Sequence, residues 1–203
     1  MSVRAVIGLG NPGPDYARSR HNLGFRVVDA LARECGVALK RVRTLLAWFG
    51  RGECRGYPLV LCKPATFMNE SGRSARRLLE YCRLTPQDLL VVVDDVRLSP
   101  GQVRLRPRGG AGGHHGLESI IREIGSSEFS RLRIGIGGAE KDDLTGHVLS
   151  EASGAEERAY REAVETAVRA VGLIVAEGLE RAMNEFNNDK TRQPITQREE
   201  ERN

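Results

Sequence analysis

Side chains that could form a hydrolytic site follow four of the apolar runs in this sequence. They are Asn11 and His21, then Phe67, Met68 and Asn69, then Asp94 and Asp95, then His114 and His115. A histidine that holds a carboxylate on one ring nitrogen can act as a general base toward water, and side-chain amides can donate to a carbonyl oxygen that gains negative charge. Each residue alone also fits a turn, a cap or a surface position. As a set they predict attack of an activated water on an ester or similar acyl bond.

Other catalytic chemistries have less support in the sequence. No G-x-S-x-G segment is present, which disfavours a serine nucleophile, and none of the four cysteines lies in these connecting segments. The adjacent His114 and His115 cannot easily point at one ion from a regular element, and no other cluster of ligands accompanies them. We therefore expect no metal.

The glycines at the start of the chain have the spacing of a dinucleotide-binding loop. Gly8, Gly10 and Gly13 spell G-x-G-x-x-G after an apolar run. That fingerprint needs the third glycine in the opening turn of a helix and an acid at the tip of the next strand. Here prolines flank the third glycine, and Asp29 falls inside a predicted helix. We therefore assign the glycines to a sharp turn that delivers Asn11, and a nucleotide-dependent oxidoreductase is the weakest alternative.

The elements that must position these side chains alternate between strands and helices. Apolar runs predict strands over 3–9, 57–64, 88–95, 102–108 and 131–138. Helical spacing predicts helices over 25–35 and 73–84, one after the glycine-rich segment at 109–116, and one over 156–187 with a break at Gly178. Residues 44–56 are predicted to be a polar, hairpin-like region, and residues 188–203 a disordered polar tail.

This order of elements predicts an α/β fold. Residues 1–187 would form a single catalytic domain with a mixed, mostly parallel β-sheet flanked by helices. The carboxyl ends of parallel strands meet at one edge of a sheet. We therefore expect the four connecting segments to bring their side chains together there.

Composition limits where such a protein works. Apolar residues make up 40% and charged residues 29% of 203 residues, as in ordinary globular proteins. No run approaches the roughly 20 apolar residues of a membrane span, and the first strand begins too early for a signal peptide. The four cysteines lack C-x-x-C spacing, so we expect free thiols in a reducing compartment. These features predict a cytoplasmic protein with no membrane association.

Arginines alternate along two of the predicted strands. Arg104, Arg106 and Arg108 occupy every second position, and Arg131 and Arg133 repeat the pattern, so each set lies on one strand face. Arginine beside glycine-rich backbone suits bidentate contacts to phosphate, although two solvated strand faces would explain the same spacing. The net charge of +4 permits a nucleic-acid partner without requiring one.

Five blocks of the sequence form a recognisable series. They read GLGNPGPDYARSRHNLGF, KPATFMNESG, VVVDD followed by LSPG, GGAGGHHGLESI, and FSRLRIGIGG. In order and spacing they resemble the motifs of bacterial-type peptidyl-tRNA hydrolases, from about residue 3 to residue 187. The family is a monomeric α/β hydrolase that cleaves the ester between a peptide and the 3′ end of tRNA. The resemblance implies peptidyl-tRNA as partner and neither metal nor organic cofactor.

The resemblance also implies roles at the centre of the site. His21 matches the general base, and Asp94 matches the carboxylate that holds its imidazole. Asp94 is the match, and Asp95 is not, when the alignment is read without gaps from the LSPG turn. Asn11 and Asn69 match the amides that position the peptide and stabilise the oxyanion.

Around that centre the resemblance implies contacts to substrate. Tyr16 matches the aromatic residue that contacts the tRNA 3′ end, and Phe67 and Met68 match the lining of the peptide channel. Arg106 and Arg133 fall where the family keeps a basic clamp for tRNA phosphate.

One position departs from the family pattern. Where the family usually reads G-G-H-N-G, this chain has His115 in place of the asparagine. Imidazole can donate one hydrogen bond but lacks the paired donor and acceptor of an amide. The departure concerns the water-positioning or substrate-binding role of this residue and leaves the base intact. It is the only feature that favours a non-catalytic, RNA-binding family member, which is the alternative function.

Overall fold

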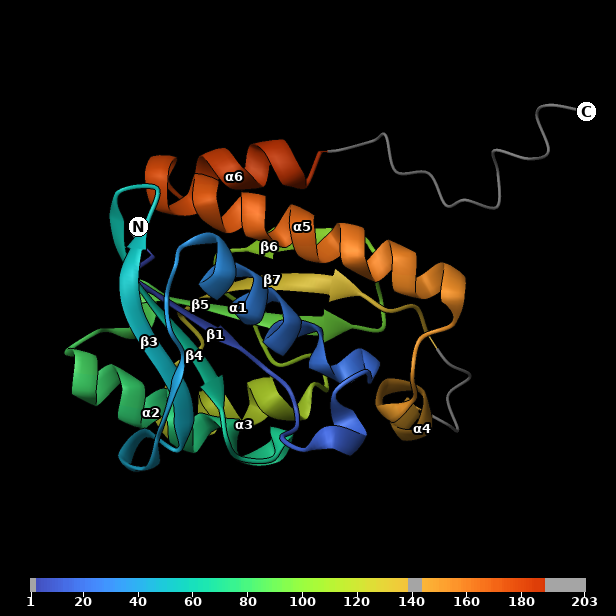
Figure 1. Cartoon of the computed structure of the whole chain (residues 1–203), viewed down its shortest axis with the longest axis horizontal. Helices are drawn as coiled ribbons and strands as arrows, with labels where there is room; N and C mark the ends of the chain where they lie inside the picture. The colour runs from blue at the N-terminus through green and yellow to red at the C-terminus, as the bar shows by residue number, and fades with distance from the viewer. Residues whose placement is uncertain (1–2, 139–143, 189–203) are drawn as a thin grey trace, which may run out of the picture.

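The computed structural model describes residues 3–138 and 144–188. One seven-stranded sheet with the order β2-β3-β4-β1-β5-β7-β6 runs through its centre (Figure 1). The strands are β1 Ala5–Gly8, β2 Lys40–Val42, β3 Ala47–Cys54, β4 Tyr57–Pro64, β5 Leu89–Asp95, β6 Val103–Arg106 and β7 Ser130–Gly135.

Helices cover both faces of this sheet. They are α1 Leu23–Glu34, α2 Ser71–Cys82, α3 His115–Ile124, α4 Leu144–Leu149, α5 Gly154–Glu177 and α6 Leu179–Phe186. Helices α1, α5 and α6 pack on one face, and α2 and α3 pack on the other (Figure 1). Val6 and Ile7 of β1 point to opposite faces and are both fully buried. Because both faces are covered, the central strands read as continuous apolar runs.

The pairing confirms a mixed sheet and locates its parallel part. The four central strands β4, β1, β5 and β7 are parallel, which accounts for three of the six strand pairs. The outer pairs β2/β3, β3/β4 and β6/β7 are antiparallel. Arg55 and Gly56 join β3 to β4, and both have positive φ, of 53° and 82°. A two-residue turn of this kind matches the twist of a hairpin.

Most of the predicted elements are confirmed, with boundaries within a few residues. The break at Gly178 is real: this residue has φ of 91° and separates α5 from α6. The region 44–56, predicted only as hairpin-like, supplies all of β3. Strand β2, helix α4 and the five short 3-10 helices of the described residues were not predicted. Residues 189–203, which hold nearly all of the predicted tail, lie outside the described residues.

The four cysteines are free thiols, as predicted, and Cys54 and Cys62 are buried. Among the helices of the described ranges, none combines the length and apolar character needed to span a membrane.

Candidate active site

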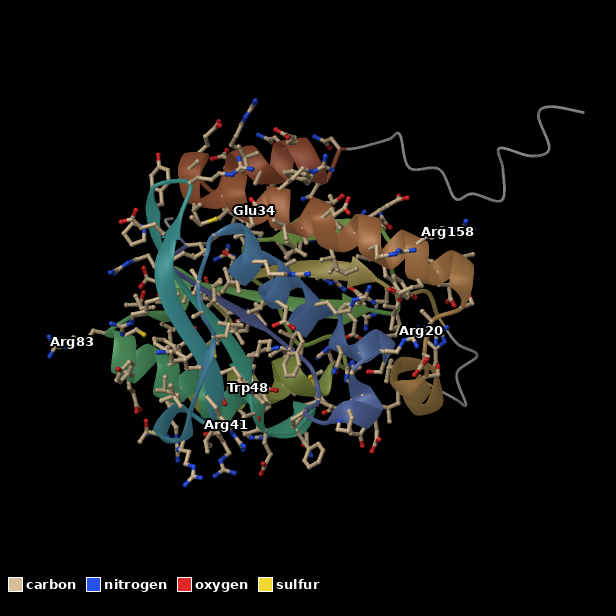
Figure 2. All side chains as sticks on the ribbon, viewed as in Figure 1. Arg20, Glu34, Arg41, Trp48, Arg83 and Arg158 are labelled. Carbon is tan, nitrogen blue, oxygen red and sulfur yellow. The ribbon has the colours of Figure 1, made fainter. Side chains whose placement is uncertain are left out.

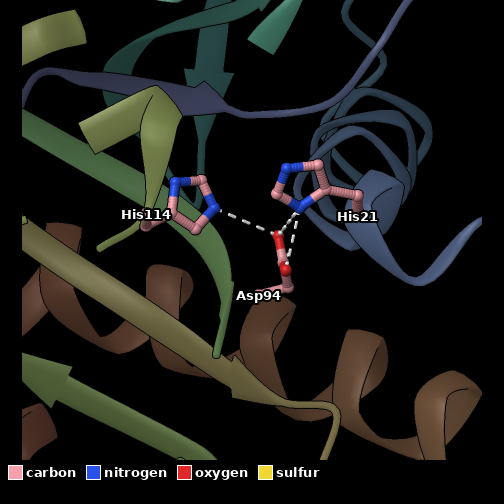
Figure 3. A group of neighbouring side chains, drawn as sticks. All are labelled: His21, Asp94 and His114. Atoms are coloured by element: carbon pink, nitrogen blue, oxygen red, sulfur yellow. Dashed lines mark hydrogen bonds and ion pairs between the residues drawn. The ribbon is translucent and has the colours of Figure 1, made fainter. Parts of the chain in front are cut away.

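Three side chains from separate segments meet at the carboxyl edge of the sheet. Nδ1 of His21 lies 2.8 Å and 2.9 Å from the two carboxylate oxygens of Asp94 (Figure 3). Nε2 of His114 lies 3.2 Å from Oδ1 of the same carboxylate. Asp94, near the end of β5, is 3% exposed, and both imidazoles are nearly buried. The structure thus brings the predicted base and its carboxylate together and adds a second histidine.

Close packing at two glycines, one in β1 and one in α1, positions the segment that carries His21. A Cβ atom on Gly24 would lie 2.4 Å from the backbone nitrogen of Leu9, and one on Gly8 would lie 2.0 Å from the carbonyl oxygen of Gly24. Only glycine allows β1 and the start of α1 to approach this closely. The short 3-10 helix η2 (Arg20–Asn22) precedes α1. His21 is therefore held against the end of β5.

Arg20 anchors the same 3-10 helix from the other side. Its guanidinium donates to Glu156, at 2.8 Å, and to the hydroxyl of Ser150, at 2.5 Å. Figure 2 shows Arg20 beside the beginning of α5. Burial alone would lower the pKa of Arg20, but Glu156 and Tyr160 outweigh it and raise that pKa. Arg20 therefore stays charged and ties the segment that carries His21 to α5.

Asn11 is fixed by reciprocal hydrogen bonds. Its backbone N–H donates to Oδ1 of Asn22 at 2.7 Å, and Nδ2 of Asn22 donates to the carbonyl oxygen of Asn11 at 3.0 Å. The side-chain Oδ1 of Asn11 accepts from the backbone N–H of Met68 at 2.8 Å. With its oxygen occupied, the amide nitrogen of Asn11 is the end left for a substrate.

The glycine turn predicted to deliver Asn11 is only partly correct. Among the three glycines, Gly13 alone has positive φ, at 116°. Gly8 and Gly10 serve close approach, since a Cβ on Gly10 would lie 2.8 Å from the ring of Phe25. Helix α1 begins ten residues beyond Gly13, and two short 3-10 helices, η1 (Pro14–Tyr16) and η2, lie between them. A dinucleotide loop, which needs the helix at the third glycine, is therefore excluded.

The segment with Phe67, Met68 and Asn69 enters the 3-10 helix η4 (Met68–Glu70). Met68 is buried against α3, where a Cβ on Gly116 would lie 2.5 Å from its sulfur. Phe67 is 56% exposed and meets the ring of Tyr16 edge to face, with 6.5 Å between the ring centres. Tyr16, which is partly buried, and the exposed Phe67 therefore form an aromatic pair next to the buried centre.

The segment that leads to His114 differs from the prediction. It was expected to follow a strand that ends at the edge of the site, but β6 is antiparallel to β7. Its last residue, Arg106, pairs with Arg131 at the opposite edge. The chain then returns through residues 107–113. The guanidinium of Arg131 donates to the carbonyl oxygens of Gly109 and Gly110 and so holds this return segment. Burial and the nearby Arg133 lower the pKa of Arg131 to about 10.

The two adjacent aspartates face different partners because strand residues alternate. Asp94 faces the two imidazoles. Asp95 forms an ion pair with Arg133 and accepts from the backbone N–H of Arg97 at 2.9 Å. Burial alone would raise the pKa of Asp94, but His21 and His114 outweigh it and lower that pKa well below its ordinary value. Asp94 is therefore an ionised carboxylate.

A cavity of about 640 Å³ opens beside this centre. Every predicted site residue except Tyr16 and Arg106 lines it; the predicted residues in its wall are Asn11, His21, Phe67, Met68, Asn69, Asp94, His115 and Arg133. Tyr16 does not line the cavity, but its ring contacts Phe67, which does. Arg106 is exposed at the end of β6 that lies away from the site, where it pairs with Arg131; Arg133 pairs with Arg104 instead.

The group His21, Asp94 and His114 is also the one cluster of potential metal ligands found in the described ranges. Its hydrogen bonds argue against an ion. Nδ1 of His114 accepts from the backbone N–H groups of Gly116 and Leu117 at 3.1 Å and 3.3 Å. The proton of this neutral ring is therefore on Nε2, which has no lone pair for a metal. The arrangement suits hydrogen bonding to the carboxylate.

The sequence gives no role to Arg20 or Asn22, and it gives His114 only as one of the candidate side chains, without a specific role. Arg20 and Asn22 flank His21 and lie in the same block that resembles the family, and these are the signals that could have found them. For His114, the signal was its position directly before a helical pattern, where an N-cap is expected.

The chain is an α/β protein whose mixed sheet holds a buried histidine–carboxylate pair, beside side-chain amides, at its carboxyl edge. Such a site suits hydrolysis. The comparisons agree, because residues 5–194 match the family model described as peptidyl-tRNA hydrolase. The chain belongs to the peptidyl-tRNA hydrolase family.

Individual relatives match over nearly their whole length. The peptidyl-tRNA hydrolase of Desulforudis audaxviator is 46% identical over 186 residues, which cover 92% of this chain and 94% of the relative. That of Synechococcus sp. strain JA-2-3B'a(2-13) is 45% identical over 188 residues, covering 92% and 84%. The crystal structure of peptidyl-tRNA hydrolase from Acinetobacter baumannii superposes with a TM-score of 0.88 at 38% identity, covering 92% of this chain and 95% of that one.

Proposed function

We propose that this chain hydrolyses the ester bond of peptidyl-tRNA with a water activated by His21. One observation carries the proposal. Nδ1 of His21 is held by the carboxylate of Asp94, while Nε2, at the opposite side of the ring, makes no hydrogen bond within the described residues. This is the arrangement of a general base whose free nitrogen faces a cavity.

The reaction follows from the positions of the protons. Nε2 of His21 takes a proton from water, and the hydroxide attacks the carbonyl carbon of the ester. Asp94 stabilises the imidazolium that forms. The tetrahedral intermediate collapses, the bond to the ribose oxygen breaks, and the imidazolium returns its proton to that oxygen. The products are a peptide with a free carboxylate and a tRNA with a free 3′-terminal hydroxyl.

The side-chain amides stabilise the intermediate. Because Oδ1 of Asn11 accepts from Met68, its Nδ2 is available to donate to the oxygen that gains negative charge. Asn69, on η4 in the same cavity wall, supplies a second amide that positions the peptide. Removing one such donor typically costs about 10²- to 10³-fold in kcat.

The rest of the cavity and its rim bind substrate. Met68 and Phe67 contact the peptide, and Tyr16 stacks against the tRNA 3′ end beside Phe67. His115, 74% exposed at the rim, donates to the substrate where relatives in the family use an amide. Arg133 and the more distant Arg106 contact phosphates in the tRNA backbone.

As the resemblance to the family implies, we also propose a monomer with one catalytic unit over residues 1–187. Peptidyl-tRNA arises during translation, so we place the enzyme in the cytoplasm. The intact His21–Asp94 pair favours catalysis over RNA binding alone.

The proposal is tested with His21→Ala and an N-blocked aminoacyl-tRNA as substrate. Release of the acyl group should be abolished while tRNA binding is retained, because the imidazole is nearly buried and contacts mainly Asp94 and His114. Free aminoacyl-tRNA serves as the specificity control for the unmodified enzyme and should not be cleaved. Unchanged turnover in the variant would disprove the role of His21.

The role of the basic residues is tested by the salt dependence of tRNA affinity. Arg106→Ala combined with Arg133→Ala should weaken tRNA binding and reduce the slope of log affinity against log salt by about one to two. Arg158→Ala, on the solvent side of α5, is the matched control (Figure 2). A double variant with an unchanged slope would show that neither arginine contacts phosphate.

A further inference from the structure

We propose that His114 is a positioning residue whose tautomer is set by the first turn of α3, which makes it a permanent hydrogen-bond donor to Asp94. The inference rests on the proposed function, since it concerns the carboxylate that holds the catalytic base. It assigns a role to a side chain that does not touch the reacting atoms.

His114 caps α3 through its ring. The first N–H groups of a helix have no partner within the helix and usually bond to a serine, threonine, aspartate or asparagine oxygen. Here Nδ1 of His114 takes that place and accepts from Gly116 and Leu117 at 3.1 Å and 3.3 Å. The carbonyl oxygen of His114 accepts from Glu118 at 3.0 Å and begins the helix.

This cap decides which nitrogen carries the proton. A proton on Nδ1 would point at two backbone N–H groups and at the positive end of the helix dipole. The neutral ring therefore carries its proton on Nε2, which lies 3.2 Å from Oδ1 of Asp94. The ring accepts from the helix N-terminus on Nδ1 and donates to the carboxylate of Asp94 from Nε2. In this tautomer His114 can only be the donor in its hydrogen bond to Asp94.

The fold makes room for this geometry. A Cβ on Gly116 would lie 3.0 Å from Cε1 of His114 and 2.5 Å from the sulfur of Met68. Glycine at this position lets the imidazole fold back over the helix start while Met68 packs beneath it. The ring is then 11% exposed and lies 5.0 Å, centre to centre, from the ring of His21.

The consequence for catalysis is orientation. The titratable groups in contact with Asp94 are the two imidazoles. With His114 donating to Oδ1, the carboxylate plane is fixed by two partners on different elements. Without that donor, Asp94 could rotate about its side-chain bond, and it would hold the imidazolium of His21 more strongly.

The tautomer can be measured without substrate. The chain has only four histidines, so two-bond ¹H–¹⁵N correlations of the ¹⁵N-labelled protein can resolve every imidazole. His114→Asn assigns its signals by their loss. We expect the His114 ring at neutral pH to show a protonated Nε2 and an unprotonated, hydrogen-bonded Nδ1. A ring protonated on Nδ1, or one that averages between tautomers, would overturn the proposal.

Kinetics of His114→Asn then separate capping from positioning. Asparagine caps helices well, but its side chain is too short to reach Asp94. Losing a hydrogen bond to a charged group should lower kcat by about 10- to 100-fold with KM changed less than about 2-fold. The acid limb of the pH profile should move to higher pH, because Asp94 then favours the imidazolium of His21.

The control is Thr85→Ala, which removes the cap of the 3-10 helix η5 (Pro86–Asp88) at the amino end of β5, away from the site. It should lower the melting temperature and leave kcat and the pH limb unchanged. If His114→Asn also left kcat and the pH limb unchanged, His114 would be a structural cap only. If His21→Ala retained turnover, the proposed function would fail, while the tautomer measurement would still decide this inference.

Discussion

Asp94→Asn probes the centre of the site by a change of one atom. The substitution keeps the shape of the side chain and exchanges a carboxylate oxygen for an amide NH₂. His114 can only donate from Nε2, because its Nδ1 accepts from two backbone N–H groups. The amide oxygen must therefore take the place of Oδ1, which faces His114, and the NH₂ takes the place of Oδ2, 2.9 Å from Nδ1 of His21.

That orientation places an N–H donor against Nδ1 of His21 and favours the wrong tautomer of this ring. Nδ1 would accept from the amide, and the proton would sit on Nε2, where it prevents the ring from accepting a proton from water. Restoring the productive tautomer breaks a hydrogen bond between two neutral groups, worth about 0.5 to 1.5 kcal/mol, and leaves a buried donor unpaired, at about 1 to 3 kcal/mol. The sum of about 1.5 to 4.5 kcal/mol corresponds to a loss in kcat of about 10- to 10³-fold.

The assay is single-turnover release of the acyl group from N-blocked aminoacyl-tRNA at saturating enzyme, so that binding does not limit the rate. Asp95→Asn is the matched control, since it makes the same change at the next residue, on the other face of β5. It should alter KM through Arg133, which pairs with Asp95, and keep kcat within about 3-fold. A loss below about 10-fold in Asp94→Asn would refute the tautomer argument.

Three further predictions concern stability and the rim. The pKa of Asp94 is lower in the folded than in the unfolded protein, so the ionised carboxylate stabilises the fold above about pH 4, and this stabilisation is lost as the pH falls further. The free energy of unfolding of Asp94→Asn, measured in urea, should therefore depend less on pH below about pH 5 than that of the unmodified protein. Gly24→Ala places a Cβ 2.4 Å from the backbone of Leu9 and should cost at least about 2 kcal/mol by urea unfolding, whereas Gly154→Ala, with open space around it, should stay within about 0.5 kcal/mol. His115→Asn should retain or raise acyl release, and complete loss would show that the site depends on this imidazole.

The central part of the fold is predictable from the sequence because burial on both faces leaves a clear pattern. The runs at 57–64 and 88–95 become β4 and β5 almost residue for residue. At the edges the pattern weakens. Strand β2 has only three residues, all at least partly exposed, and no alternation of apolar and polar residues marks it. Its place is set by pairing with β3, which is a tertiary interaction.

Strand direction was the other feature that the sequence could not supply. The alternation in QVRLRPR predicts β6 but not whether it runs parallel or antiparallel to its neighbour. The antiparallel choice puts Arg106 at the edge far from the cavity and makes residues 107–113 carry the chain back to His114. Arg131 was predicted as part of an alternating basic face, but it is buried and holds this return segment.

The adjacent histidines show how strongly the start of a helix divides neighbouring residues. His114 lies just outside α3, where its backbone is extended and its ring folds back to cap the helix beside Asp94. His115 is the first helical residue, so its side chain projects to the rim, 74% exposed and 3.4 Å from Glu118. An exchange of asparagine for histidine at this second position therefore changes the chemistry of the rim without touching the buried centre. Under the proposed function, the expected departure at His115 bears on how substrate is held, and His21 keeps the carboxylate of Asp94, to which His114 donates.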